Sequence, residues 1–169
     1  MSELNALIDP LLTEELRRDV LAWRNHIHRH PELSFKEYET AAYIERELRA
    51  MGYDDVASPT PTSRVATLCG GKGPGRTIAL RADIDALPVE EAEGLACRSV
   101  VPGVSHVCGH DAHAAMLLGT AKLLLSIKDE IPGTVKFFFQ HAEEQAPGGA
   151  AEMVKAGVLE GVDACVGLH

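Results

Sequence analysis

Two short apolar runs near the end of the chain, separated by one helical segment, constrain the fold most strongly. Residues 134–140, TVKFFFQ, are typical of a buried strand, and residues 163–169, DACVGLH, of another. Between them, residues 148–156 favour a short helix that ends at Gly157. Strand, helix and strand at this spacing predict a parallel pair joined by a right-handed crossover. We therefore expect an α/β fold with a mixed, mainly parallel sheet flanked by helices.

The first half of the chain carries clear helical periodicity. Residues 13–30 place apolar side chains on one face, as in an amphipathic helix. A second helix is predicted from the capping-box pattern of Ser34 and Glu37 to a stop at Gly52. Residues 112–127 have a wide apolar face and predict a third helix.

Strand and loop signals fill the middle of the chain. Two short apolar runs, residues 65–70 and 77–82, flank a turn-rich GKGPGR segment and predict a hairpin. Cys69 and Cys165 lie in apolar strand-like runs, so we expect both to be buried. Residues 86–107 have no sustained period and predict a long loop, a feature that is usually functional in a compact domain.

Composition narrows the class of protein. With 46% hydrophobic and 24% charged residues, the 169-residue chain is typical of one globular domain. No apolar run reaches the roughly 18 residues of a membrane span, and the first residues do not resemble a signal peptide. The net charge of -9, without a block of lysine or arginine, argues against nucleic acid as a partner. We expect a cytoplasmic protein with no membrane partner, whose cysteines are free thiols or ligands.

Side chains that can bind metals gather after the predicted strands. They are Asp83 and Asp85 after residues 77–82, Cys108 and His110 before the third helix, His141, Glu143 and Glu144 after TVKFFFQ, and His169 at the end of the last strand. Ligands of open α/β sheets bind at the carboxyl edge of the strands, so these groups are expected to meet there. Imidazole, thiolate and carboxylate together suit zinc, manganese, cobalt or nickel better than calcium or magnesium.

The spacing within two of these motifs suggests how the roles divide. Cys108 and His110 are two residues apart, so in an extended loop both side chains can share one metal site. Glu143 and Glu144 are adjacent and point in opposite directions, so one can bind metal while the other faces a water molecule. The spacing alone does not say which glutamate does which.

Five motifs, in order and with the expected gaps, resemble one family. They are WRNHIHRHPELS, ALRADIDALP, VPGVSHVCGHDAH, FFFQHAEE and GLH, and they extend from about Leu21 to His169. The sequence is similar to the metal-dependent amidohydrolases that include hippurate hydrolases, plant auxin-conjugate hydrolases and bacterial N-acyl-L-amino acid amidohydrolases. The resemblance implies a zinc-aminopeptidase-like α/β/α domain that holds two divalent transition-metal ions.

The resemblance also implies roles for individual residues. Four positions match metal ligands: Cys108, His110, Glu144 and His169. Glu143 matches the general base, which takes a proton from a metal-activated water and passes it to the departing amine.

Other residues match the family motifs in supporting positions. Asp85, which we group with the catalytic residues, and Asp83 match an acidic strand end that orients ligands and tunes their basicity. His106 and His113 are candidates for contact with substrate or with a ligand carboxylate. Arg81 is expected to form a structural ion pair.

Four further histidines lie within these motifs. His26, His28 and His30 are interpreted as local packing or helix capping. His141 stands where the family usually has proline.

Members of this family are more than twice as long as this chain. We expect residues 1–169 to be the N-terminal part of the catalytic domain, with a lid or dimerisation domain and the C-terminal part of the catalytic domain absent. Such a fragment is expected to be inactive. The full-length enzyme, a homo-oligomer, would hydrolyse the amide bond of a small-molecule N-acyl amino acid, hippurate-like or auxin-conjugate-like. A deacetylase of N-acetyl-diaminopimelate, a peptidase of the same fold and a non-catalytic binding module remain alternatives.

Overall fold

A five-stranded mixed sheet in the order β1-β2-β4-β3-β5 organises the computed structural model, which describes residues 8–167 and 169. The strands are β1 (Val56–Ala57), β2 (Arg64–Cys69), β3 (Thr77–Asp83), β4 (Thr134–Gln140) and β5 (Ala164–Gly167). β3 pairs in parallel with β4 and β5, whereas β2 pairs antiparallel with β1 and β4. The expected α/β fold with a mixed sheet is confirmed.

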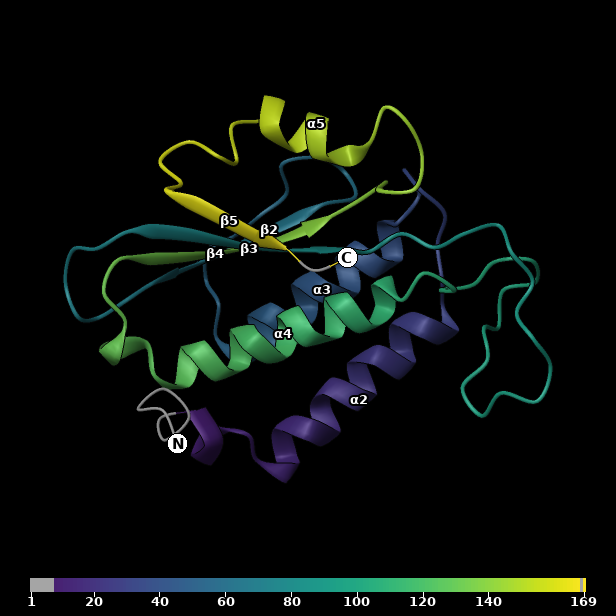
Figure 1. Ribbon diagram of the computed structural model, residues 1–169, viewed down its shortest axis with the longest axis horizontal. Coiled ribbons are helices and arrows are strands. Elements are labelled where there is room, and N and C mark those ends of the chain that lie inside the picture. Colours follow the sequence, from purple (N-terminus) through teal and green to yellow (C-terminus); the bar gives the residue numbers. More distant parts are fainter. Residues whose placement is uncertain (1–7, 168) are drawn as a thin grey trace.

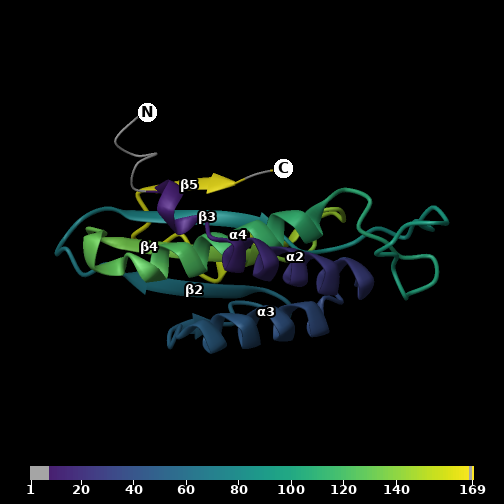
Figure 2. The ribbon, with the colours of Figure 1, turned by 90° about the horizontal axis from the view of Figure 1, so that it is seen from below.

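Helices cover both faces of this sheet (Figures 1 and 2). On one side lie α2 (Glu14–Arg29), α3 (Tyr38–Met51) and α4 (His110–Ser126), and on the other lies α5 (Gly149–Lys155). Two 3-10 turns, η1 (Asp9–Leu11) and η2 (Lys128–Glu130), complete the elements. Within the described residues, none of the helices combines the length and apolar character needed to cross a bilayer.

The three phenylalanines of β4 show how the sequence builds these layers. Successive side chains of a strand point to opposite faces. Phe137 and Phe139 belong to the larger core beneath α2, α3 and α4, and Phe138 belongs to the smaller core with Met153 of α5. All three are buried, so β4 requires cover on both faces and occupies the centre of the sheet.

The central position of β4 corrects two predictions of strand pairing. β2 and β3 do not form a hairpin, because β4 lies between them. Their connection crosses the start of β4, where Gly70 N donates to Gly133 O at 2.8 Å and a Cβ on Gly75 would lie 2.7 Å from the Gly133 backbone. β4 and β5 are not neighbours either, since both flank β3.

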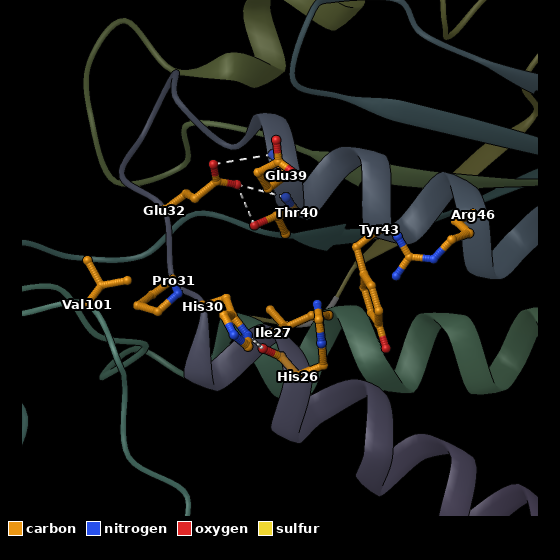
Figure 3. A pocket seen from close by; sticks show the side chains of 10 residues that line it. All are labelled: His26, Ile27, His30, Pro31, Glu32, Glu39, Thr40, Tyr43, Arg46 and Val101. Atoms are coloured by element: carbon orange, nitrogen blue, oxygen red, sulfur yellow. Dashed lines mark hydrogen bonds between the residues drawn. The ribbon is translucent and has the colours of Figure 1, made fainter.

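The start of α3 differs from the predicted capping box. Neither Ser34 nor Glu37 caps the helix, and Glu32 does so instead (Figure 3). Its Oε2 accepts from Thr40 N at 2.7 Å and from Thr40 Oγ1 at 2.8 Å, and its Oε1 accepts from Glu39 N at 3.3 Å. Ser34 and Glu37 are buried and contact distant parts of the chain. The predicted stop at Gly52 is confirmed by its left-handed φ of 110°.

Two cysteines are exposed where the sequence predicted burial. Cys69 is the last residue of β2, beyond the cover of the helices, and Cys165 lies on β5, where all four residues are exposed. β5 is an edge strand, so an apolar sequence there does not imply a buried side chain. The predicted long loop is confirmed, because residues 86–107 contain no helix or strand and extend away from the sheet (Figure 1).

Candidate metal centre

Three parallel strands deliver most of the predicted site residues to one edge of the sheet. Asp83 is the last residue of β3, and Asp85 follows it by two. Glu143 and Glu144 lie in the loop after β4, and His169 follows β5. Because β3, β4 and β5 run in the same direction, their carboxyl ends meet, as the sequence predicted.

The fourth contribution comes from the start of α4. His110 is its first residue and its side chain is fully buried. Gly109 precedes it with a φ of 89°, a left-handed conformation that glycine adopts without strain. This turn brings the loop that carries Cys108 into the helix, and both side chains reach the same site.

Four of the converging side chains are the four predicted metal ligands. One donor atom from each of Cys108, His110, Glu144 and His169 lies within 4.8 Å of the other three. His169 Nε2 is 3.4 Å from His110 Nε2 and 3.8 Å from Cys108 Sγ, and His110 Nε2 is 3.6 Å from Glu144 Oε1. Donors around a tetrahedral zinc ion are spaced by about 3.3 to 3.6 Å, given its bond lengths. The spacing and the chemistry of this group fit a transition metal.

A second group of donors overlaps the first. It joins Asp83 and Glu143 to His110 and His169, again with donor atoms within 4.8 Å of one another. Asp83 Oδ2 is 3.6 Å from His110 Nε2, and Glu143 Oε2 is 3.6 Å from His169 Nε2. Asp83 was predicted to support the ligands, and the structure places it among the donors themselves. The two groups share the Nε2 atoms of His110 and His169, and one imidazole nitrogen binds only one ion, so together they form one continuous cluster of six donor residues.

Asp85 connects the two sides of the site. Its Oδ1 lies 3.2 Å from His110 Nδ1, and its Oδ2 accepts from Glu144 N at 3.0 Å. Burial alone would raise the pKa of Asp85, but hydrogen bonds from His110, Ser34 and the Glu144 backbone lower it well below its usual range. The Asp85 carboxylate therefore occupies Nδ1 of His110. Nε2, on the other side of the ring, remains available to bind a metal ion.

Asp83 is held by two further side chains. Arg81 Nη1 donates to its Oδ2 at 2.7 Å, the ion pair predicted for this arginine. His113 Nδ1 lies 2.7 Å from its Oδ1, so His113 contacts a carboxylate of the site, one of the two contacts considered for it. His106 does not, since neither ring nitrogen has a hydrogen-bond partner among the described residues, and burial lowers its pKa to about 4.

The concentration of carboxylates has a clear electrostatic effect on the thiol. A hydrogen bond with Glu144 is the main cause that raises the pKa of Cys108 to about 11, and burial and the charges of Glu143 and Asp83 act in the same direction. In His110, burial lowers the pKa, but Asp85 and Asp83 outweigh it and the net pKa is raised. The site thus has an excess of negative charge that suits a cation.

The other histidines pack outside the donor groups. His28 is buried between two carboxylates, with Nδ1 2.7 Å from Asp111 Oδ2 and Nε2 2.7 Å from Glu91 Oε1. It thereby ties α2 to the start of α4 and to the long loop, a function that the sequence did not reveal. His26 stacks on Tyr43 at 3.8 Å, and His141 Nε2 lies 3.1 Å from Glu152 Oε2.

A cavity of about 400 Å³ lies between α2 and α3, away from the donor groups (Figure 3). His26, His30 and Tyr43 contribute to its walls, with Glu32 and Arg46. It contains none of the predicted catalytic or metal-binding residues, so we do not assign the chemistry of the site to it.

Comparisons with known proteins agree with this arrangement. The model of peptidase family M20/M25/M40 matches residues 79–169. The chain is 52% identical over 158 residues to an N-acyl-L-amino acid amidohydrolase of Geobacillus stearothermophilus and 47% identical over 167 residues to thermostable carboxypeptidase 1 of Saccharolobus solfataricus. Each alignment covers 94% of this chain and 42% of the relative, so the chain spans about two fifths of the relatives' length.

A solved structure is similar to this chain in three dimensions as well. It is a Bacillus subtilis protein described as a dinuclear metal binding peptidase from the M20 family. It superimposes with a TM-score of 0.88 at 42% sequence identity, over 93% of this chain and 44% of that one.

Proposed function

This chain belongs to peptidase family M20/M25/M40, and on that premise we propose that it carries the metal-binding site of an amidohydrolase that cleaves N-acyl amino acids. The single observation that supports this best is the pair of overlapping donor groups at the carboxyl edge of the sheet. The name of the Geobacillus relative, an N-acyl-L-amino acid amidohydrolase, supports the choice of an N-acyl amino acid as substrate.

The roles within the site follow from the donor groups. We assign Cys108, His110, Glu144 and His169 as metal ligands, because their donor atoms form one compact group. Asp83 is close enough to join them, from the second group. The ions would be zinc, manganese, cobalt or nickel, given the mixture of thiolate, imidazole and carboxylate. When bound, they would polarise the amide carbonyl and lower the pKa of water from 15.7 to about 7.

Glu143 is the residue that we expect to move protons. Its side chain is 26% exposed, so it is open to water, and Oε2 belongs to the second donor group, 3.6 Å from His169 Nε2. It would take the proton from the attacking water and deliver it to the nitrogen of the departing amine, a role typically worth about 100- to 10,000-fold in rate. Asp85 keeps His110 and the Glu144 backbone in place during this exchange.

The relatives leave the finer substrate open. Their names include an amidohydrolase and a carboxypeptidase, and both reactions break an amide bond. Because the chain spans about two fifths of these proteins, we propose that residues 1–169 form the N-terminal part of a catalytic domain. A hippurate-like or auxin-conjugate-like substrate is our preferred assignment, ahead of a peptide or of N-acetyl-diaminopimelate.

The experiment that tests the proposal is the Glu143→Ala substitution in the full-length protein. Turnover of N-acetyl, N-benzoyl and indole-acetyl amino acids should fall by about 100- to 10,000-fold while metal content is retained. Glu144→Ala is the matched control, since removal of a ligand should lower the metal content as well. Undiminished turnover in Glu143→Ala would refute the assignment of the base. A wild-type protein that binds metal but cleaves none of these substrates, nor dipeptides, would favour a binding module.

A further inference from the structure

The turn before α3 inserts two polar side chains beneath the loop that carries Glu143 and Glu144. We propose that Glu37 and Ser34 are positioning residues, which restrain this loop on both sides of Glu143. The inference rests on the proposed function, because it assigns a purpose to the position of the base. Ser34 and Glu37 were predicted to form a capping box, but their side chains bond Asp85 and Ala142 instead of the start of α3.

Glu37 restrains the loop at Ala142, the residue before the proposed base. Its side chain is fully buried, and Oε1 accepts from Ala142 N at 2.7 Å, across 105 residues of sequence. Ala142 has a φ of 47°, a left-handed conformation that is strained for a non-glycine residue and persists only where the surroundings impose it. Ala142 directly precedes Glu143, so the hydrogen bond that Ala142 N donates to Glu37 fixes the backbone from which the base projects.

Ser34 restrains the same loop from its other side, through Asp85. Ser34 Oγ donates to Asp85 Oδ2 at 2.6 Å, and the same carboxylate oxygen accepts from Glu144 N at 3.0 Å. The backbone N–H groups of Ala142 and Glu144 are therefore both held by buried carboxylates. Glu143 lies between these two fixed points.

One local feature of the backbone allows both contacts. Phe35, between Ser34 and Glu37, has a φ of 66°, and its ring packs edge-on against His141 at 5.7 Å. His141 is the residue before Ala142. The turn thus contacts the loop directly through the Phe35 ring and the Glu37 carboxylate, and indirectly through the hydrogen bond from Ser34 to Asp85.

A role in stability alone is a poor explanation for Glu37. It does not cap α3, and its Oε2 has no hydrogen-bond partner among the described residues. Burial raises its pKa, as expected for a carboxyl group removed from water. An apolar side chain of the same size would avoid this desolvation, so a buried carboxyl group contributes little net stability. What an apolar side chain could not provide is the acceptor for Ala142 N.

The test compares Glu37→Met with Glu37→Gln in the full-length, metal-loaded protein. Glutamine keeps an acceptor oxygen and carries no charge, whereas methionine keeps the volume and removes the acceptor. We expect kcat to fall about 100-fold in Glu37→Met with KM changed by less than about threefold, because a small misplacement of a catalytic group is sufficient for such a loss. Glu37→Gln should restore kcat to within about fivefold of wild type. Equal impairment of the two variants, or no impairment of Glu37→Met, would overturn the proposal.

Glu32→Met is the matched control. It removes a glutamate from the same segment that caps α3 and contacts no residue of the loop, so it should lower thermal stability without changing kcat. Amide hydrogen exchange over residues 141–145 gives a readout independent of turnover, and it should accelerate in Glu37→Met and not in Glu32→Met. Faster exchange with an unchanged kcat would overturn the proposal.

A third variant keeps the inference testable if Glu37→Met does not fold. Ser34→Ala, a small change, should lower kcat by about tenfold with KM retained, and an unchanged kcat would count against the proposal. Failure of the proposed function itself would appear separately, as unimpaired turnover of Glu143→Ala.

Discussion

The charge state of Cys108 links the geometry of single residues to metal binding. With a pKa of about 11, the metal-free thiol is protonated at neutral pH. A metal ligand must be the thiolate, so binding at this position displaces a proton. Below pH 11, the apparent affinity should rise about tenfold per pH unit from this residue alone.

We therefore expect Cys108→Ser to release about one proton fewer than wild type per metal bound at this position at pH 7. Titration calorimetry in buffers of different ionisation enthalpy measures this number directly. His110, whose pKa is raised, is present in both proteins, so the protons that it releases form a common background in the comparison. Equal proton release by the two proteins would show that Cys108 is not a ligand.

The convergence of Cys108, His110, Glu144 and His169 was predictable, but the place of Asp83 among the donors and the supporting contacts were not. Cys108, His110 and His169 each follow or precede an element whose position the sequence revealed. Ser34 and Glu37 form a pattern with an adequate local explanation as a capping box. Their actual partners lie 51 and 105 residues away, and only the tertiary structure determines such contacts.

At the scale of elements, Glu45 joins α3 to β2. Its Oε1 accepts from Arg49 Nε at 2.9 Å within the helix, and its Oε2 accepts from Arg64 Nε at 2.8 Å across to the strand. The hydrogen bond from Arg49 is the main cause that lowers the pKa of Glu45, and the bond from Arg64 adds to it. A carboxyl group whose pKa is lower in the folded state stabilises the fold above the unfolded-state pKa, and this contribution is lost as the pH falls.

The Glu45→Gln variant should therefore be less stable than wild type at pH 7, by about 1 kcal/mol. The difference should shrink as the pH falls below 4.5, the ordinary pKa of the group, because wild type then loses the same charge. Urea denaturation of both proteins at pH 7 and at progressively lower pH checks this. A difference that stays constant with pH would exclude an ionic contribution.

The contact between α2 and α4 depends on the absence of a side chain at Gly119. A Cβ added there would lie 2.6 Å from Val20 Cγ2. Valine in a helix has one strongly preferred rotamer and cannot easily move aside. Gly119→Ala should destabilise the protein by about 1–3 kcal/mol, although alanine is the better helix former.

A double-mutant cycle isolates this contact. In a Val20→Ala background the obstruction is gone, so Gly119→Ala should be neutral or stabilising by up to about 1 kcal/mol. Thermal denaturation of the four proteins provides the coupling energy. A coupling energy near zero would show that the helices are free to separate at this point.

The elements themselves were more predictable than their pairing. α2, α3 and α4 follow the periodicity of their apolar residues, and α3 ends at the predicted glycine. The order of the strands was not evident, because chain proximity favours a hairpin between β2 and β3. The strand order depends instead on the phenylalanines of β4, which must be buried on both faces of the sheet. Such burial is a property of the whole sheet and not of two neighbouring segments.

At the scale of the whole molecule, cover is uneven between the centre of the sheet and its β5 edge. β4 is buried, whereas β5 forms an edge whose four residues are all exposed, with Val166 at 57%. Nearby apolar side chains are also exposed, Val154 at 53% and Leu159 at 41%. Within the described residues, β5 pairs only with β3, so its outer backbone groups are available to another strand.

We expect the 169-residue chain to self-associate through this edge. Lysine on an edge strand opposes such pairing, because a charge cannot be buried between strands at low cost. Val166→Lys should thus lower the average mass in sedimentation equilibrium toward the 18.2 kDa of one chain. Val154→Lys is the matched control, since it adds the same charge at an equally exposed valine that lies on α5 and not on the strand. If both substitutions lowered the mass equally, net charge and not the strand edge would control association, and a wild-type chain that is monomeric throughout would refute the prediction.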